Sequence, residues 1–296
     1  MRLGINLAIA TKRWPEPEAW TAFVRDDLGL ELVQFSFDLL DPWWPAKQRA
    51  AQADRVRAAA ASAGLRIHSA QIGFAGYSFN MLLGPDPELR ALGETWWERA
   101  IEVAVGIGAG AMGGPVGALT VTSAGVAGER EARYAELLEI LVRLSGRAAH
   151  AGLEALLVEP TPLRREIPGT VEEGRRLADD LRGRTAVPVE YVVDVGHAMY
   201  EPLYGTPAPL APWLDALGQD VGVLHLQNTD FQSDSHWGWP DARGRVDVAA
   251  FARDAEASGL DVPVILEIVH PFELDDDAMR AHVVSSVEHC RRALGG

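Results

Sequence analysis

Four apolar stretches of this chain carry, at or near their ends, a residue that can bind a cation or move a proton. "LLVE" ends in Glu159, "YVVD" in Asp194 and "VILE" in Glu267, while "VLHL" contains His225. Neighbouring members of this series are separated by roughly 30 to 40 residues, about one strand-and-helix unit of a barrel. Strands repeated at this interval end side by side, so we expect the four side chains to form one cluster.

The chemistry of such a cluster suits a hard divalent cation. Three carboxylates and one imidazole offer mainly oxygen ligands, which favour Mn²⁺, Mg²⁺ or Co²⁺ over ions that prefer thiolates. Three carboxylates this close together would repel one another strongly without a cation between them. A lone glutamate after a strand is usually a loop or salt-bridge residue, so the prediction depends on the conjunction. The prediction is that Glu159, Asp194, His225 and Glu267 bind one divalent cation, with Mn²⁺ as the first choice.

Other polar side chains could line a pocket beside this cluster. His197 follows Asp194 by three residues, and we expect it to contact a substrate hydroxyl rather than the cation. Gln227 lies two residues after His225 and therefore shares its strand face. Three more residues on early strands could form the far wall or could equally be plain core residues: Asn6, Gln34 and His68.

Tryptophan is abundant, with nine residues. Five of them follow apolar runs in segments expected to be loops: Trp14, Trp43, Trp44, Trp237 and Trp239. Their flat faces could pack on the C–H groups of a ligand and exclude water, and we single out Trp14 and Trp237 as substrate-binding candidates. Anchoring of loops or a contact between subunits explains such residues equally well.

The hydrophobic pattern alternates along the whole chain between short apolar runs and longer amphipathic segments. Strands are expected over residues 3–9, 30–39, 65–73, 109–117, 153–162, 187–197, 221–230 and 262–271. Helices are expected over residues 17–29, 46–64, 86–108, 129–152, 170–183, 209–218, 247–259 and 277–294. The strand segments are mostly apolar throughout, which is typical of parallel strands covered on both faces.

Eight such units without a linker or a break in composition predict an α/β protein, a (βα)₈ TIM barrel that forms a single domain over residues 1–296. The alternative is a doubly wound open sheet. No GxGxxG sequence follows the first expected strand, which removes the main support for a dinucleotide-binding sheet. The N-terminal "MRLGINLAIA" is interpreted as the first strand rather than as a signal peptide.

Composition limits the partners. The chain has 296 residues and a net charge of −15, so its surface as a whole repels nucleic acids and anionic membranes. It has a single cysteine, Cys290, and therefore no internal disulfide, which fits a reducing compartment and a cytoplasmic protein. No run of 18 apolar residues is present, so no membrane span is expected.

The stretches "LLVEPTP", "YVVDVGHA", "VLHLQNTD" and "VILEIVHP" resemble the xylose-isomerase-like TIM barrels, and the resemblance covers essentially the whole chain. That family includes sugar isomerases, ketose 3-epimerases, hydroxypyruvate isomerase and endonuclease IV. The resemblance implies that the four clustered residues bind one divalent ion. It also implies that Glu159 and Glu267 are the acid–base pair, and that His197 contacts substrate.

The reaction expected from this resemblance is proton transfer next to a carbonyl group, through a cis-enediolate, with the two glutamates as acid and base. Interconversion of an aldose and a ketose, on a small sugar or sugar phosphate, is the first choice, and ketose 3-epimerisation the second. Lys12-Arg13 and Arg164-Arg165 could hold a phosphate, although solvated surface pairs explain them as well. A homo-oligomer is possible.

Two departures from family patterns affect the alternatives. Ketose 3-epimerases carry an arginine shortly after the histidine of strand 7, whereas this chain reads "QNTDFQSDSHWGW" there. Endonuclease IV, a phosphodiesterase with three zinc ions and extra histidines, is the competitor from another class. The segment "AMGGPVG" lacks the histidine that such an enzyme needs, although Asp234-Ser235-His236 would suit it. A third reading, a catalytically inactive binding barrel, is disfavoured because both glutamates are present.

Overall fold

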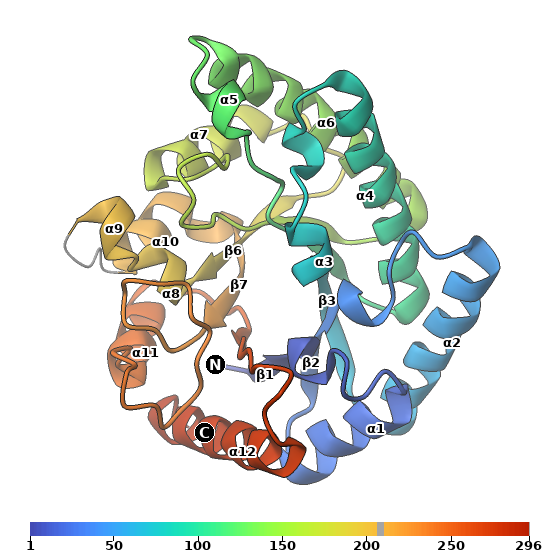
Figure 1. The fold of residues 1–296 in the computed structure, drawn as a ribbon, viewed down its shortest axis with the longest axis vertical. Coiled ribbons are helices and arrows are strands. Elements are labelled where there is room, and N and C mark those ends of the chain that lie inside the picture. Colours follow the sequence, from blue (N-terminus) through green and yellow to red (C-terminus); the bar gives the residue numbers. More distant parts are fainter. Residues whose placement is uncertain (206–209, 296) are drawn as a thin grey trace.

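The computed structural model describes residues 1–205 and 210–295, and its eight parallel strands close into a barrel. Each strand pairs with the next one along the chain, and β8 pairs with β1 to complete the closure. The longer helices form a ring around the strands (Figure 1). The predicted (βα)₈ fold is confirmed, and the doubly wound open sheet is wrong.

The strands are short. In the order β1 to β8 they span Leu3–Asn6, Leu32–Ser36, Arg66–Gln71, Ala111–Gly114, Ala155–Val158, Val189–Asp194, Val221–Leu226 and Val264–Leu266. The surrounding helices are α1 (Pro17–Ala22), α2 (Ala46–Ser62), α4 (Pro87–Ile107), α6 (Glu129–Ala151), α7 (Val171–Leu181), α10 (Ala211–Leu217), α11 (Val248–Ala257) and α12 (Asp276–Ala293). A π-helical turn, Phe23–Asp27, extends α1. Residue 209, where the sixth helix was expected to begin, lies outside the described residues.

Most strands end earlier than the hydrophobic pattern predicts, and local polar caps explain why. Asn6 ends β1 because its side-chain oxygen accepts a hydrogen bond from the Ala8 amide at 2.8 Å, which starts the 3₁₀ turn Leu7–Ala10. Asp194 ends β6 in the same way, since it caps the short helix α8 (Val195–Ala198). The apolar residues after these ends remain buried in the loops, so apolar character alone overestimates the strand length.

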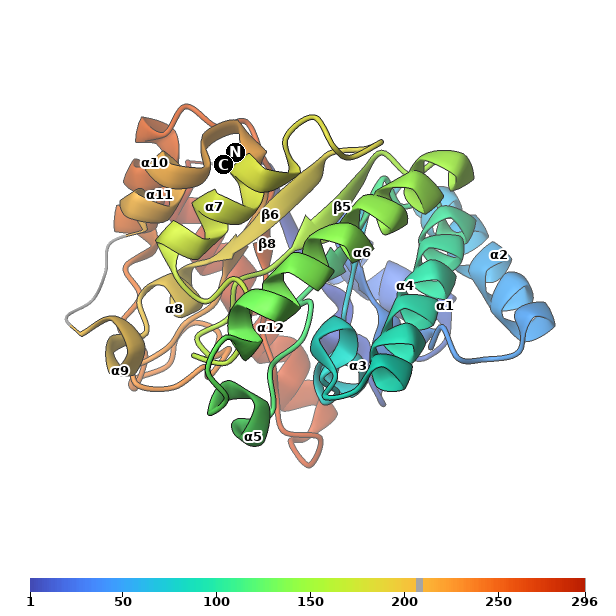
Figure 2. The ribbon, with the colours of Figure 1, turned by 90° about the horizontal axis from the view of Figure 1, so that it is seen from above.

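Short helices gather at one end of the barrel. Besides α8, these are α3 (Phe74–Tyr77), α5 (Val121–Ala124) and α9 (Glu201–Tyr204). The helices α3, α5 and α8 each follow a strand, and α9 follows α8. The side view places them on the same side of the molecule (Figure 2). The loops that follow the carboxyl ends of the strands therefore form this face, where active sites of such barrels are built.

Two apolar cores support that face. The larger core fills the space between the strands and the surrounding helices. A smaller one plugs the inside of the barrel and consists of Leu32, Ala111, Ala155, Leu157, Val192, Val223 and Ile265. The interior positions that follow along the strands are polar, which leaves a layer of polar side chains above an apolar plug. No helix in the described ranges is both long and apolar enough to cross a membrane.

Strand β4 is rich in glycine because β5 lies too close for a side chain. A Cβ atom placed on Gly113 would lie 1.9 Å from the carbonyl oxygen of Leu157, and the backbone there cannot move without opening the barrel. By contrast, a Cβ atom on Gly146, within α6, meets no described atom within 4 Å.

These two glycines predict opposite effects of one added methyl group. Gly113→Ala should destabilise the barrel by about 3 kcal/mol or more, because the backbone must be displaced. Gly146→Ala should stabilise it by about 0.5 to 1 kcal/mol through helix propensity. Thermal and urea unfolding of both variants would measure this difference. If Gly113→Ala unfolds like the wild type, the close approach of β4 to β5 is not a constraint on the sequence.

Candidate active site and metal centre

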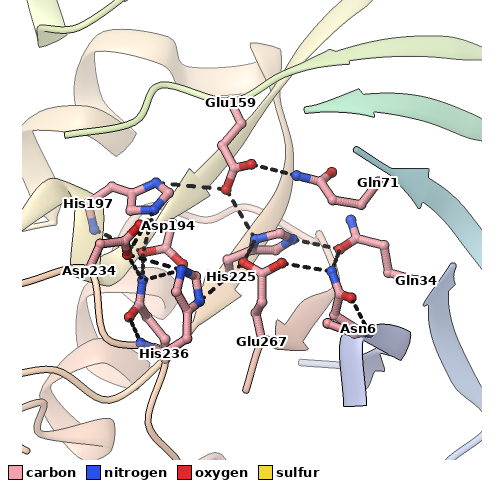
Figure 3. A network of polar contacts seen from close by, with 12 residues as sticks. Asn6, Gln34, Gln71, Glu159, Asp194, His197, His225, Asp234, His236 and Glu267 are labelled. Carbon is pink, nitrogen blue, oxygen red and sulfur yellow. Dashed lines mark hydrogen bonds and ion pairs between the residues drawn. The ribbon is translucent and has the colours of Figure 1, made fainter. Parts of the chain in front are cut away.

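Glu159, Asp194, His225 and Glu267 come together in the polar layer above the apolar plug (Figure 3). One possible ligand atom of each lies within 4.8 Å of the others. Asp194 and His225 are paired residues of β6 and β7, and the two glutamates directly follow β5 and β8. The structure therefore places side by side the four residues that were expected to form one cluster.

Hydrogen bonds on the far side of His225 define which of its ring nitrogens faces the cluster. Its Nε2 atom lies 2.8 Å from the Gln34 Oε1 atom, which can only accept, so Nε2 carries the hydrogen. In the neutral ring, Nδ1 then presents a lone pair. That lone pair faces Glu159 Oε1 at 3.3 Å and Glu267 Oε2 at 3.0 Å. Three electron-rich atoms in contact need a proton or a cation among them.

Asp194 is held in a fixed orientation. Its Oδ1 atom accepts hydrogen bonds from the His197 amide at 2.9 Å and from Gln227 Nε2 at 3.0 Å. Its Oδ2 atom is buried and has no hydrogen-bond partner among the described residues, and the same is true of Glu159 Oε1 and His225 Nδ1. Buried polar atoms normally have partners. Three orphaned ligand atoms in one place are what a missing cation would leave, so these residues fit a divalent ion.

The two glutamates are bound to amides on their outer sides. Gln71 donates a hydrogen bond to Glu159, and Asn6 Nδ2 donates one to Glu267 Oε1 at 2.8 Å. Burial raises the pKa of Glu159 above its ordinary value. Burial also acts to raise the pKa of Glu267, but the hydrogen bond and charge of His225 together with the charges of His236 and His197 outweigh it and lower this pKa to about 2. Burial acts to lower the pKa of His225, yet the two carboxylates raise it to about 10.

A second group of possible ligands adjoins the first and consists of His197, Asp234 and His236. Asp234 Oδ1 lies 3.2 Å from His197 Nε2 and 3.0 Å from His236 Nε2. His197 Nδ1 lies 3.1 Å from the Pro160 carbonyl oxygen and donates to it, while Nε2 faces the Asp234 carboxylate. Gln227 Nε2 links the two groups, because it also donates to Asp234 Oδ1 at 2.8 Å.

These side chains open into a small cavity of about 80 Å³. At roughly 30 Å³ of liquid volume per water, this is space for only a few water molecules. Its lining includes six polar residues that can contact a ligand: Asn6, Glu159, His197, Asp234, His236 and Glu267. The reacting atoms of a ligand can therefore lie against these side chains.

Comparison with known proteins gives the family. The family described as xylose isomerase-like TIM barrel matches residues 25–284. The chain belongs to this family.

Several relatives are similar to this chain over most of its length. A crystal structure from Rhodospirillum rubrum ATCC 11170, provisionally described as a xylose isomerase, is 38% identical, covers 99% of both chains and has a TM-score of 0.96. The D-erythrulose 1-phosphate 3-epimerase of Brucella abortus (strain 2308) is 22% identical over 90% of this chain and 88% of its own. The D-psicose 3-epimerase of Clostridium cellulolyticum H10 shares the fold, with 15% identity, 99% coverage of both chains and a TM-score of 0.76. The matches support an enzyme of the sugar isomerase and epimerase class.

Some of the expected substrate-binding residues lie outside the cavity of this xylose isomerase-like barrel. Trp14 packs against Phe23, with ring centroids 5.0 Å apart, between the barrel and the outer helices. His68 contacts Ser69 Oγ at 3.2 Å, and burial together with the charges of Arg66 and Arg2 lowers its pKa to about 4. Those arginines lie at or before the beginnings of strands, so His68 is near the opposite end of the barrel.

The remaining expected residues divide between two roles. Asn6 and His197 line the cavity, as expected of substrate contacts. Gln227 is fully buried and orients Asp194, so it acts behind the cavity wall. Trp237 lies next to the cavity residue His236 but lines a separate, outer cavity.

Sequence reasoning missed several residues of the site. Gln71 was not considered, since a glutamine at the end of a strand has no distinctive spacing. Asp234 and His236 were noted only as support for a nuclease. Their spacing of two residues was the available signal, because both side chains line the cavity. The buried Glu166 also went unnoticed, in the loop between β5 and α7.

Because Glu166 is buried, we expect the free energy of unfolding to depend on pH. Burial raises its pKa from 4.5 to about 7. Between these values the unfolded chain has released the proton that the folded protein retains, so this group destabilises the fold increasingly as the pH rises. The penalty is complete above about pH 7 and amounts to about 3 kcal/mol. Glu166→Gln should therefore gain stability relative to the wild type between pH 5 and pH 8.

Urea unfolding at several pH values would measure this gain, with the exposed Glu256→Gln as the matched control. The control should change the pH dependence much less. Equal curves for Glu166→Gln and the wild type would mean that Glu166 ionises in the folded protein as readily as in the unfolded chain.

Proposed function

We propose that this protein moves a proton at the carbon next to the carbonyl group of a small sugar, with Glu159 and Glu267 as the acid–base pair. The observation that carries the proposal is the placement of the two carboxyl groups. They approach His225 from opposite sides of the cavity (Figure 3), at 3.3 and 3.0 Å from its Nδ1 atom. Two carboxyl groups that reach one point from two sides can remove a proton from one face of a carbon and return it to the other.

This arrangement favours epimerisation of a ketose at C3 as the reaction. The similarity to D-erythrulose 1-phosphate 3-epimerase over most of both chains supports the same choice. Interconversion of an aldose and a ketose uses the same two carboxyl groups, with return of the proton to the neighbouring carbon, and is the second candidate. The similarity to the Rhodospirillum rubrum protein favours it.

A divalent cation is part of this proposal, with Mn²⁺ as the first choice and Glu159, Asp194, His225 and Glu267 as its ligands. Such an ion would act as a Lewis acid on the carbonyl oxygen and the neighbouring hydroxyl group of the substrate. The chain's own residues do the rest. Asn6 and Gln71 hold the two glutamates in place, and His197 can bind a substrate hydroxyl. The small cavity excludes most water from the reacting atoms.

A hydrolytic function of the endonuclease IV type is the competing candidate, and the second ligand group favours it. Two adjacent cations can activate a water molecule against a phosphodiester. The net charge of −15 opposes binding of a nucleic acid, because counterion release requires clustered cationic side chains. Pro115 lines the cavity directly after β4, where a further histidine would be needed.

The first prediction for this function concerns the cation. Protein purified without chelators should contain one equivalent of a divalent metal, and removal of the metal should lower the melting temperature because the carboxylates then repel one another. His225→Ala should weaken metal binding by at least about tenfold. His150→Ala, on the exposed side of α6, serves as the control.

Elemental analysis and melting curves with added Mn²⁺ would measure both effects. Two equivalents of metal would show that the second ligand group is also occupied and would favour the hydrolytic candidate. Full activity in a metal-free protein would eliminate the cation from the proposal.

The second prediction concerns the two glutamates. Glu159→Gln and Glu267→Gln should each lower turnover by about 100-fold or more, because glutamine keeps the shape but cannot accept the proton. Assays need saturating Mn²⁺, since either change also removes a ligand charge. Glu190→Gln, a half-buried glutamate at the start of β6, should retain full activity.

NMR in D₂O with a panel of ketoses and their phosphates would follow the proton directly. Exchange at C3 supports the epimerase, and exchange at C1 alone supports aldose–ketose interconversion. Cleavage of abasic-site DNA with Zn²⁺, without exchange into any ketose, would replace both with the hydrolytic function.

A further inference from the structure

A second, larger cavity lies directly outside the small one. Its volume is about 680 Å³, within the range of 300 to 1,000 Å³ typical of ligand sites. Phe74 and Val269 belong to the walls of both cavities, so the two spaces adjoin there. Nothing in the proposed chemistry uses the outer space.

The chain segments between the cavities face both of them. In the segment after β7, Asp234 and His236 line the inner cavity while Ser235 and Trp237 line the outer one. A backbone hydrogen bond of 2.8 Å from the Val269 amide to the His236 carbonyl joins this segment to the one after β8. A ligand bound at the glutamates therefore extends outward along a wall that the same residues build.

The outer wall combines aromatic and polar side chains. Phe272 and Phe74 are 48% and 42% exposed, and Trp237 lies beside them in the lining. Exposed aromatic rings of this kind pack on the C–H faces of sugar rings. Polar groups of Ser235, Asp241 and Glu273 surround them and can bind hydroxyl groups.

The charges of this wall favour an uncharged ligand over a phosphate. Arg243 Nη2 lies 2.6 Å from Asp241 Oδ2, and the guanidinium also stacks on the Trp237 ring at 4.0 Å, so its charge is already neutralised. Lys12 lies over Phe272, with its Nζ atom 5.2 Å from the ring centroid, but Glu273 follows in the same wall and offsets it. An anion would need an excess of positive charge that the lining does not provide.

The histidine pair in the outer wall also favours an uncharged ligand. His282 Nε2 lies 3.2 Å from the Pro240 carbonyl oxygen and donates to it, so His282 Nδ1 accepts from His270 Nε2 at 2.9 Å. His270 Nδ1 is then an acceptor, and it has no hydrogen-bond partner in the described part of the chain. An acceptor in the wall suits a hydroxyl group, which has a hydrogen to donate, and not a phosphate dianion, which has none. Burial lowers the pKa of His270 to about 4, so it stays an acceptor at neutral pH.

We infer that the outer cavity is a subsite for a second, uncharged sugar unit, and that the substrate is a glycosylated sugar whose reacting unit enters the inner cavity. This inference rests on the proposed function for the inner unit alone. The outer subsite takes a pyranose-like ring against Phe272 and Trp237, with its hydroxyl groups directed to Ser235, Glu273 and His270.

The test compares isomaltulose, in which a glucosyl unit is attached to O6 of fructose, with fructose itself and with fructose 6-phosphate. Saturation-transfer NMR on the Mn²⁺-free protein reports which protons touch the chain, and titration gives the dissociation constants. Isomaltulose should bind at least tenfold more tightly than fructose, with saturation of the glucosyl protons. Phe272→Ala should weaken the binding of isomaltulose by roughly three- to tenfold and leave the binding of fructose unchanged. Phe79→Ala, which changes an even more exposed phenylalanine outside both cavities, should alter neither.

Three results would overturn the inference. They are tighter binding of fructose 6-phosphate than of isomaltulose, no saturation of the glucosyl unit, and an equal effect of Phe272→Ala on both sugars. Proton exchange with Mn²⁺ present is measured separately on the same sugars. Absence of exchange with glucosyl binding intact would refute the proposed function and leave the outer subsite standing.

Discussion

Mutual repulsion of carboxylates in a poorly screened interior is the constraint on which the rest of this site depends. Glu159 and Asp194 are nearly fully buried, and Glu267 is close to both. At an effective dielectric constant of about 20, two unit charges 4 Å apart repel by about 4 kcal/mol. The barrel tolerates this only because positive charge can enter, as a proton on His225 or as a cation. The chain therefore stores electrostatic energy where a positively charged or polarised group is to be bound.

Amide side chains make the arrangement specific. Asn6, Gln34, Gln71 and Gln227 each contact a member of the charged cluster, and each uses a neutral group to do so. A lysine or arginine in these positions would neutralise the carboxylates permanently. Amides instead orient the oxygen atoms and leave their charge available. Three of these amides lie on β1, β2 and β3, which contribute no member of the cluster, and the fourth directly follows β7, which also carries His225.

The sequence predicted the barrel and the central cluster because both follow from periodicity. Alternating apolar runs and amphipathic segments specify eight units, and polar residues at the ends of core strands must meet at one face. The directions in which loop side chains point do not follow from any periodicity of the sequence. Trp14 occupies a loop after β1 as Trp237 occupies one after β7, yet one packs beneath the outer helices and the other lines a cavity. The position of Asp234 and His236 depended on the path of their segment and on its pairing with Val269, which composition does not reveal.

The pairing of β1 with β8 has a consequence for the order in which a ribosome builds the protein. Asn6 and Glu267, which are hydrogen-bonded to each other, are separated by 261 residues. At a usual rate of about 5 to 20 residues per second, roughly 13 to 50 seconds pass between their synthesis. Throughout that interval β1 is an unpaired edge, the state that chaperones protect from aggregation. A cation held by the four clustered residues could not act as a nucleus for folding during synthesis, because Glu267 is made only when translation is almost over.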